Sequence, residues 1–286
     1  MHKPFVSIVC PIYNSEKYVD TLIKSLLDQD YGEENYEILV VDNNSSDSTL
    51  DKLKNYPIII YSENTIKSSY AARNLGILKA KGEIIALIDA DCIADSRWLS
   101  QGVSKVLEGY DLVSGKVEFY FKNPTDPWEL FDSIFHMNNE ENYKKGRATT
   151  ANLFIKKSVF LNIGLFNGFA KSGEDFRWTK KATNLGYSLY YHTHTIVKHP
   201  TRNREESIKK AERIAVGFQT SYKSTFLSNF KRTALVSYII INLLPVKKVC
   251  QVFRASNLKF SQKSEVLKVL LTIGAYKIRA LTKAWL

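Results

Sequence analysis

The feature that most constrains this chain is a repeated alternation, in its first half, of short apolar runs and stretches with helical spacing. The apolar runs are 5–10, 36–41, 58–61 and 83–88, and the helical stretches between them are 16–29, 48–55 and 70–79. Strands that are apolar throughout and alternate with helices are typical of a mostly parallel sheet covered on both faces. The first half therefore predicts an α/β fold.

The middle of the chain is less regular, but it still contains segments of both kinds. We expect strands at 112–119, 152–155 and 188–192, and helices at 128–142 and 174–185. No repeat, low-complexity tract or clear linker is evident before about residue 203. A chain of 286 residues with 44% hydrophobic content can build one large domain with a sizeable core and an appendage.

The net positive charge of the chain comes entirely from its C-terminal segment. Residues 207–286 hold 15 Lys and Arg but 2 Asp and Glu, whereas the first 206 residues have a net charge of −2. A basic excess confined to one segment suggests an anionic surface as a partner, and we expect no nucleic acid. The segment 204–225 is amphipathic, with an apolar face made by Ile208, Ala211, Ile214, Ala215, Phe218 and Tyr222.

The cysteines and the N-terminus indicate the cellular compartment. Cys10, Cys92 and Cys250 lie far apart, which argues against a disulfide framework and for a reducing environment. The first residues contain no long apolar run followed by a cleavage site, so we expect no signal peptide and a cytoplasmic location.

Polar residues follow three of the predicted strands, at the edge where ligands bind to such sheets. The most informative are Asp89 and Asp91, which directly end the apolar run 83–88. Two carboxylates at this spacing can hold a hard divalent cation, Mn²⁺ or Mg²⁺, between the phosphates of a ligand. An ordinary polar loop is the alternative, and the position at a strand end favours the metal.

Asp42 ends the second predicted strand and can accept hydrogen bonds from a nucleotide base or a ribose hydroxyl. Helix N-capping is the alternative function of this loop, for which Asp47 and Ser48 are better placed. Both roles are compatible with the same loop.

Four segments together resemble the successive signatures of family 2 glycosyltransferases, namely 6–14, 41–49, 72–77 and 88–91. Their order and spacing match across about residues 5–200. The resemblance implies a GT-A fold and transfer, with inversion, of a sugar from a nucleotide-diphosphate sugar, commonly UDP-linked, to a hydroxyl acceptor. It implies donor-binding roles for Pro11, Tyr13, Asn14, Asp42, Arg73, Asn74 and Asp89, and a metal-binding role for Asp91.

The acceptor side is suggested by the segment 172–178, which is similar to the Glu-Asp motif of the same family. The resemblance makes Asp175 the general base, with Glu174, Arg177 and Trp178 on the acceptor side. Such a base takes the proton of the acceptor hydroxyl while its oxygen attacks the anomeric carbon. Favourable placement of acids in a first helical turn is the alternative for Glu174 and Asp175, and burial in the core is the alternative for Trp178.

Two more residues and one departure follow from the resemblance. His199 lies where some relatives place a third metal or diphosphate ligand, although a structural histidine is the alternative. Asn152 resembles an asparagine near the donor sugar. Asn43 stands where many relatives carry an acid.

We expect a catalytic domain at 1–203 and a basic amphipathic helical extension at 204–286. Within the domain, 1–110 is the nucleotide-sugar-binding half and 111–203 the acceptor half. The apolar segment 234–246 is too short to span a membrane, which needs about 20 residues. Its basic flanks favour an in-plane anchor at the inner face of a membrane, and a lipid-linked or cell-surface glycan precursor as acceptor. The alternative is packing of these helices on the catalytic domain.

Other function classes fit less well. A dehydrogenase lacks its GxGxxG after the first strand, a kinase its GxxxxGK[ST], and a nucleotidyltransferase its Gly-rich loop with Arg. A non-catalytic nucleotide-sugar-binding module remains an alternative, which the presence of Asp89, Asp91 and Asp175 disfavours.

Overall fold

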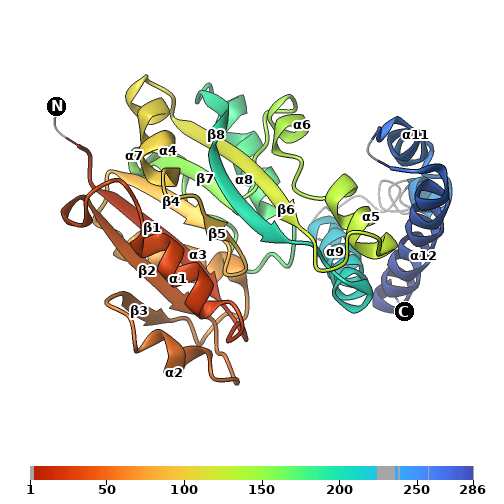
Figure 1. Cartoon of the computed structure of the whole chain (residues 1–286), viewed down its shortest axis with the longest axis horizontal. Coiled ribbons are helices and arrows are strands. Elements are labelled where there is room, and N and C mark those ends of the chain that lie inside the picture. Colours follow the sequence, from red (N-terminus) through yellow and green to blue (C-terminus); the bar gives the residue numbers. More distant parts are fainter. Residues whose placement is uncertain (1–2, 224–235, 238, 257, 286) are drawn as a thin grey trace. The chain divides into compact units, whose positions relative to one another are not determined.

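The computed structural model describes residues 3–223, 236–237, 239–256 and 258–285 (Figure 1). The chain forms two compact units. Unit 1 consists of Met1–Glu118, Asn138–Phe169 and Glu174–His199. Unit 2 consists of Phe119–Met137, Ala170–Gly173 and Pro200–Leu286. The domain boundary expected at residue 203 stays a prediction.

Unit 1 is built on an eight-stranded sheet in the order β3-β2-β1-β4-β7-β6-β8-β5. Its first four strands are β1 (Val6–Ile12), β2 (Tyr36–Asp42), β3 (Ile59–Ser62) and β4 (Ile84–Ile88), and they pair in parallel. Helices α1 (Val19–Leu27), α2 (Thr49–Leu53) and α3 (Ser69–Lys79) connect them. Every residue of β1 and β4 is buried, as the continuous apolar runs predict.

Helix α3 packs very closely on the sheet. A Cβ atom at Gly76 would lie 2.5 Å from Val9 Cγ1, so glycine is required there. Ser68 begins the helix by accepting a hydrogen bond from the Tyr70 amide. This packing fixes the face of α3 that carries Tyr70 and Arg73.

The second half of the sheet contains antiparallel strands. Strand β7 (Asn152–Lys156) pairs antiparallel with β4 and with β6 (Leu112–Tyr120), and β8 (Leu189–Pro200) pairs antiparallel with β5 (Ile93–Ala94). The mixed α/β class and the mostly parallel sheet are confirmed. Strands β7 and β5 are antiparallel to their neighbours, whereas β6 and β8 start together at Leu112 and Ser188, end together at Tyr120 and Thr201, and run in the direction of β1–β4. An apolar run reports burial on both faces and not the direction of the strand.

The remaining helices of unit 1 are α4 (Trp98–Leu107), α6 (Asn139–Tyr143), α7 (Lys157–Ile163) and α8 (Glu174–Asn184). The single helix expected at 128–142 is two, because Met137 has a φ of 50° and the Asn138 side chain caps α6 through the Glu141 amide. Strand β8 is much longer than the expected 188–192, and the extra length carries the chain to His199.

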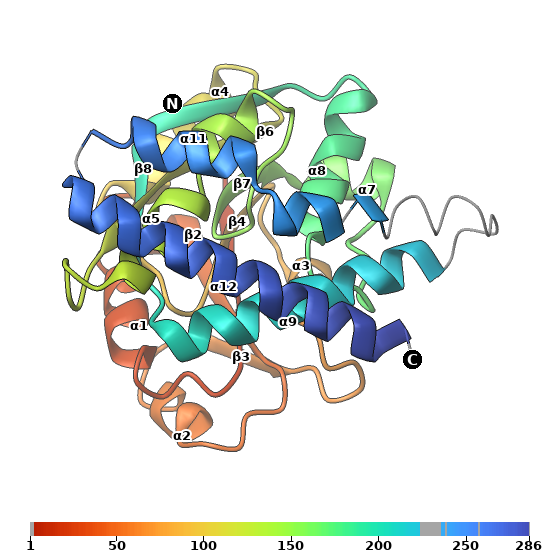
Figure 2. The same cartoon turned by 90° about the vertical axis from the view of Figure 1, so that its right-hand side faces the viewer.

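Unit 2 is helical and has its own core. It contains α5 (Pro127–Phe135), α9 (Arg204–Lys223), α11 (Val246–Arg254) and α12 (Phe260–Trp285), and α9 and α12 lie side by side (Figures 1 and 2). The buried cluster consists of Leu130, Phe131, Ala211, Val252, Leu258, Val266, Val269, Leu270 and Ile273. A Cβ atom at Gly274 would lie 2.4 Å from the Asn242 carbonyl oxygen, so the chain around Asn242 crosses α12 closely.

The predicted helix at 204–225 is observed as α9. Residues 224–225, the start of the apolar segment at 234–235 with its basic flank Lys231 and Arg232, and Tyr238 lie outside the described residues, as do the side chains of Phe218 and Tyr222. No helix in the described part of the chain is long and apolar enough to cross a membrane.

Candidate active site

The loop that follows β1 is tied to the loop that follows β2. Asn14 has a φ of 44°, and its Oδ1 accepts a hydrogen bond of 2.8 Å from the Ser46 amide. The side chain of Tyr13 is 43% exposed, and the Lys67 ammonium lies 4.7 Å from the centre of its ring. Pro11 is buried at the end of β1. The aromatic ring is thus displayed at the carboxyl edge of the sheet, where a base could stack on it.

Asp42 is nearly inaccessible, with 2% exposure, and its carboxylate shapes the loop after β2. It accepts hydrogen bonds from the amides of Asn44 (3.0 Å) and Ser45 (3.1 Å). The capping alternative belongs to Asp47, which accepts from the Thr49 amide at 3.1 Å, whereas the Ser48 side chain makes no cap. In this structure the contacts of Asp42 hold the loop in shape.

Asn43, the departure from the family pattern, is buried and braces the same region. Its side-chain amide donates to the carbonyl oxygens of Glu63 and Ile66, both at 2.9 Å. A carboxylate could not donate these two hydrogen bonds. Asn43 therefore joins the loop after β2 to the segment that leads into α3.

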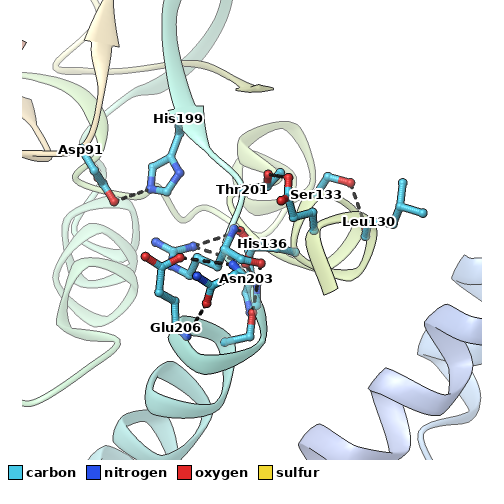
Figure 3. Close-up of polar contacts among 12 residues, drawn as sticks. Asp91, Leu130, Ser133, His136, His199, Thr201, Asn203 and Glu206 are labelled. Atoms are coloured by element: carbon cyan, nitrogen blue, oxygen red, sulfur yellow. Dashed lines mark hydrogen bonds and ion pairs between the residues drawn. The ribbon is translucent and has the colours of Figure 1, made fainter. Parts of the chain in front are cut away.

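Asp91 and His199 come together from distant parts of the sequence. Asp91 follows β4 and His199 is the second-last residue of β8, and Asp91 Oδ2 lies 3.2 Å from His199 Nε2 (Figure 3). The imidazole is fully buried. The metal-ligand atoms of Asp91, Cys92 and His199 all lie within 4.8 Å of one another.

This donor set fits a divalent cation such as Mn²⁺, which accepts carboxylate oxygen and imidazole nitrogen. Burial raises the pKa of the Cys92 thiol well above its ordinary value, so its sulfur stays protonated and is a weak ligand. The fit therefore rests on Asp91 and His199, with further positions left to oxygens of a ligand or water.

Arg73 of α3 contacts Asp89, which precedes Asp91 by two residues. It is 4% exposed, and one of its terminal nitrogens donates to Asp89 Oδ1. Its Nε is buried and has no hydrogen-bond partner within the part of the chain that the structure describes. A buried donor without a partner is costly, and a phosphate or ribose oxygen would satisfy it.

Asp175 occupies the first turn of α8, where the sequence predicts it. Its Oδ1 accepts a hydrogen bond of 3.2 Å from the Tyr70 hydroxyl, which itself accepts one of 3.1 Å from the Glu174 amide. Burial raises the pKa of Asp175, and the charge of Asp89 raises it further. Hydrogen bonds from the Phe176 amide and Tyr70, and the charge of Arg73, oppose this increase.

Tyr70 is the residue that the sequence analysis missed. The available signal is its position three residues before Arg73 on a predicted helix, which places both side chains on one face.

Asn152 is fully buried, and all its polar atoms contact protein. Its amide nitrogen donates to the carbonyl oxygens of Lys116 (2.8 Å) and Thr195 (2.9 Å), and its oxygen accepts from Trp98 Nε1 at 2.9 Å. Asn152 thus links β6, β7, β8 and α4, and these contacts are structural.

Asn74 and Trp178 are also held by the protein. The Asn74 side chain donates to the carbonyl oxygen of Phe166 (2.8 Å) and accepts from its amide (3.1 Å). Trp178 is 3% exposed, packs against Phe160 and Phe166, and donates to the Gly164 carbonyl oxygen. This placement favours the core role that the sequence left open for Trp178.

Glu174 and Arg177 form an ion pair on α8. Glu174 Oε2 accepts from Arg177 Nε at 2.8 Å, and Oε1 accepts from the Asn167 amide at 3.0 Å. Glu174 is buried while Arg177 is exposed, so Glu174 anchors the start of α8 next to Asp175.

Comparison with known proteins gives this geometry its context. Residues 7–164, more than half of the chain, match the family described as Glycosyl transferase family 2. The chain belongs to this family. The glycosyltransferase AglE of Haloferax volcanii is similar at 36% identity over 249 residues, which cover 85% of this chain and 82% of that protein.

One further relative and one solved structure extend the comparison. A Methanococcus voltae protein is 35% identical over 235 residues, covering 72% of this chain and 69% of that protein. Its name is dolichyl N-acetyl-α-D-glucosaminyl phosphate 3-β-D-2,3-diacetamido-2,3-dideoxy-β-D-glucuronosyltransferase. The mannosyltransferase PcManGT of Pyrobaculum calidifontis, solved with GDP-Man and Mn²⁺, aligns with a TM-score of 0.65 and 18% identity, covering 100% of this chain and 88% of that one.

These comparisons confirm the predicted GT-A fold and show that the chain is a glycosyltransferase. The nucleotidyltransferase and non-catalytic interpretations of the sequence are set aside by the family.

Proposed function

We propose that this glycosyltransferase moves a sugar, with inversion, from a UDP-linked donor to a hydroxyl group of a lipid-linked or cell-surface glycan precursor. The observation that supports this best is that one face of α3 contacts both the candidate base and Asp89, which lies two residues before the metal-binding pair's Asp91. Asp91 and His199 make up the pair, and Tyr70 and Arg73 of α3 contact Asp175 and Asp89.

The donor is held on the β4 side. The base would be held by Pro11, Tyr13, Asn14 and Asp42, and the ribose by Asp89. Asn74 would act indirectly, by fixing the backbone of Phe166 against α3. Arg73 would donate its free Nε–H to the ribose or diphosphate. A divalent cation, Mn²⁺ or Mg²⁺, bound by Asp91 and His199 would supply positive charge against the diphosphate as the sugar leaves.

The acceptor is activated on the α8 side. The carboxylate of Asp175 takes the proton of the acceptor hydroxyl, and the acceptor oxygen forms a bond to the anomeric carbon. The bond between that carbon and the diphosphate oxygen breaks, and its electron pair stays on the nucleoside diphosphate. Because a single displacement proceeds from the opposite face, the configuration inverts. The ion pair of Glu174 and Arg177 fixes the start of α8 on the acceptor side. Asn152 supports the sugar-binding side through its hydrogen bonds within the protein and does not contact the sugar itself.

The name of the Methanococcus voltae relative describes a dolichyl phosphate-linked acceptor, which supports a lipid-linked acceptor here. Unit 2 offers a surface that suits a membrane. The apolar knuckle, defined as Ile240, Ile241, Leu243, Leu244 and Val246, is between 52% and 69% exposed at each residue. Lys247 and Lys248 follow it directly.

Exposed apolar side chains beside lysines bind an anionic leaflet through both burial and charge. We therefore assign 204–286 to a peripheral site at the cytoplasmic face of the membrane.

The experiment that tests the transferase measures donor turnover by purified protein. A panel of nucleotide sugars is supplied with Mn²⁺ or Mg²⁺, with and without EDTA, together with a membrane extract as acceptor. Turnover of one donor that is lost with EDTA and in Asp91→Ala, but kept in the surface control Asp51→Ala, would support the proposal. Absence of any donor or nucleotide binding in the presence of metal would overturn it.

A further inference from the structure

Tyr70 makes the most specific contact of the candidate base. It lies in the first turn of α3, is 7% exposed, and reaches α8 with its hydroxyl group. The hydroxyl donates to Asp175 Oδ1 and accepts from the Glu174 amide, so both of its hydrogen-bonding functions are used. A residue 104 positions earlier in the sequence thus connects α3 to the N-terminus of α8.

The ring of Tyr70 is held as firmly as its hydroxyl. Phe166 packs against it with ring centres 5.9 Å apart, and the Arg73 guanidinium carbon lies 5.5 Å from the ring centre. Arg73 is in turn bound to Asp89. A contiguous set of side chains therefore joins Asp89, on the donor side, to Asp175.

We propose that Tyr70 is a positioning residue for the transfer reaction, which orients the Asp175 carboxylate and keeps it ionised for the acceptor hydroxyl. This inference rests on the proposed role of Asp175 as the base. A hydrogen bond from a hydroxyl to a carboxylate is stronger than one to a carboxylic acid, so Tyr70 favours the form that can take a proton.

The charges around Asp175 explain why such a donor matters. Burial and the Asp89 carboxylate both favour the protonated acid. The Tyr70 hydrogen bond, the Phe176 amide and the Arg73 charge oppose them, and Tyr70 is the side chain among these that touches Asp175 directly. Burial and the charge of Asp175 raise the pKa of Tyr70, so its hydroxyl remains a donor at neutral pH.

The test replaces Tyr70 by phenylalanine, which keeps the ring and its contacts with Phe166 and Arg73. We expect kcat to fall about tenfold to a hundredfold, as removal of a hydrogen bond to a charged group does. We expect the KM for the donor to change little. The acid limb of the pH profile of kcat/KM should move to higher pH, because the pKa of Asp175 rises without its donor.

The matched control is Tyr56→Phe, which removes another tyrosine–aspartate hydrogen bond, from Tyr56 to Asp20 Oδ1 at 2.7 Å on the surface. It should leave both kcat and the pH profile unchanged. A normal profile in Tyr70→Phe, or a fall in kcat with an unmoved acid limb, would overturn the inference, since a merely structural role predicts no shift.

A second variant covers the case that Tyr70→Phe is poorly folded. Insertion of 3-fluorotyrosine at position 70 keeps the ring and hydroxyl but makes the hydroxyl a stronger donor, so the acid limb should move to lower pH. An unmoved or raised limb would contradict the inference. Asp175→Asn separates the two proposals. Full activity in that variant would show that Asp175 is not the base, and it would contradict the proposed function independently of any result for Tyr70.

Discussion

Both units of this glycosyltransferase contain largely buried ion pairs, Arg73 with Asp89 in unit 1 and Arg202 with Asp132 in unit 2, but they place other lysines and exposed apolar side chains differently. In unit 1 the charged side chains of the candidate site are paired with other side chains, Arg73 with Asp89 and Asp91 with His199. In unit 2, Lys248 and Lys277 have no carboxylate partner among the described residues, and burial lowers the pKa of both, that of Lys277 to about 8.

Apolar exposure follows the same division. In unit 1 the large exposed apolar side chains, such as Leu78, Leu107 and Leu161, are scattered along the chain, whereas those of the apolar knuckle in unit 2 are nearly consecutive. Scattered exposure is ordinary, but a gathered patch marks an interaction site. Under our proposal, unit 1 holds groups in place for chemistry and unit 2 presents a surface for binding.

The largest expected effect tests the chemical side of this comparison. Asp175→Asn removes the proton acceptor without changing its size, and we expect the transfer rate to fall about 10²–10⁴-fold. Initial rates with saturating donor measure it, and the thermal midpoint shows whether the variant is folded. A folded variant with a rate within threefold of the parent would contradict the assignment of the base.

The second effect concerns the metal-binding pair. His199→Ala removes one of the two proposed metal ligands and keeps Asp91. We expect the Mn²⁺ concentration for half-maximal activity to increase by at least about 10–100-fold, because loss of a residue that only hydrogen-bonds to a metal ligand already weakens metal binding by that factor. Titration of Mn²⁺ against activity measures it. The control His194→Ala changes an exposed histidine of the same strand and should behave as the parent; an unchanged Mn²⁺ requirement in His199→Ala would exclude this histidine as a ligand.

The third effect tests the binding side. Leu243→Ser with Leu244→Ser reduces the burial available to the apolar knuckle, and we expect binding to vesicles containing phosphatidylglycerol to weaken by about tenfold or more. Flotation of the full chain with vesicles over a salt series measures this. Leu107→Ser with Leu161→Ser is the matched control in unit 1. Equal losses in both variants, or no binding by the parent, would remove the distinction between the units.

The smallest effect is a displacement of the pH profile of the parent enzyme. Because burial raises the pKa of Asp175, activity should be present above that raised pKa and lost as the pH falls through it. The acid limb of kcat/KM should therefore lie above about 4, the ordinary value for aspartate. A limb at or below that value would show that the carboxylate is more solvated than its surroundings in unit 1 indicate.

The sequence could locate the site residues that follow strands, since the end of an apolar run specifies the edge of the sheet. Asp42, Asp89 and Asp91 are the candidates that this reasoning predicts. It could not separate residues that face a ligand from those that brace the fold. The sequence motif is the same in either case for Asn152, Asn74 and Trp178. Only their hydrogen bonds to Thr195, Phe166 and Gly164 show that their side chains support the fold.

By itself the sequence determined the α/β class, the order of the first strands and helices, the family and the basic C-terminal helices, because these depend on local periodicity and on motifs within short segments. The tertiary structure decided the antiparallel direction of β7, the meeting of Asp91 with His199, and the contact of Tyr70 with Asp175. Each of these joins residues more than 60 positions apart, and such pairs are chosen by the packing of the whole unit and leave no mark in the local pattern.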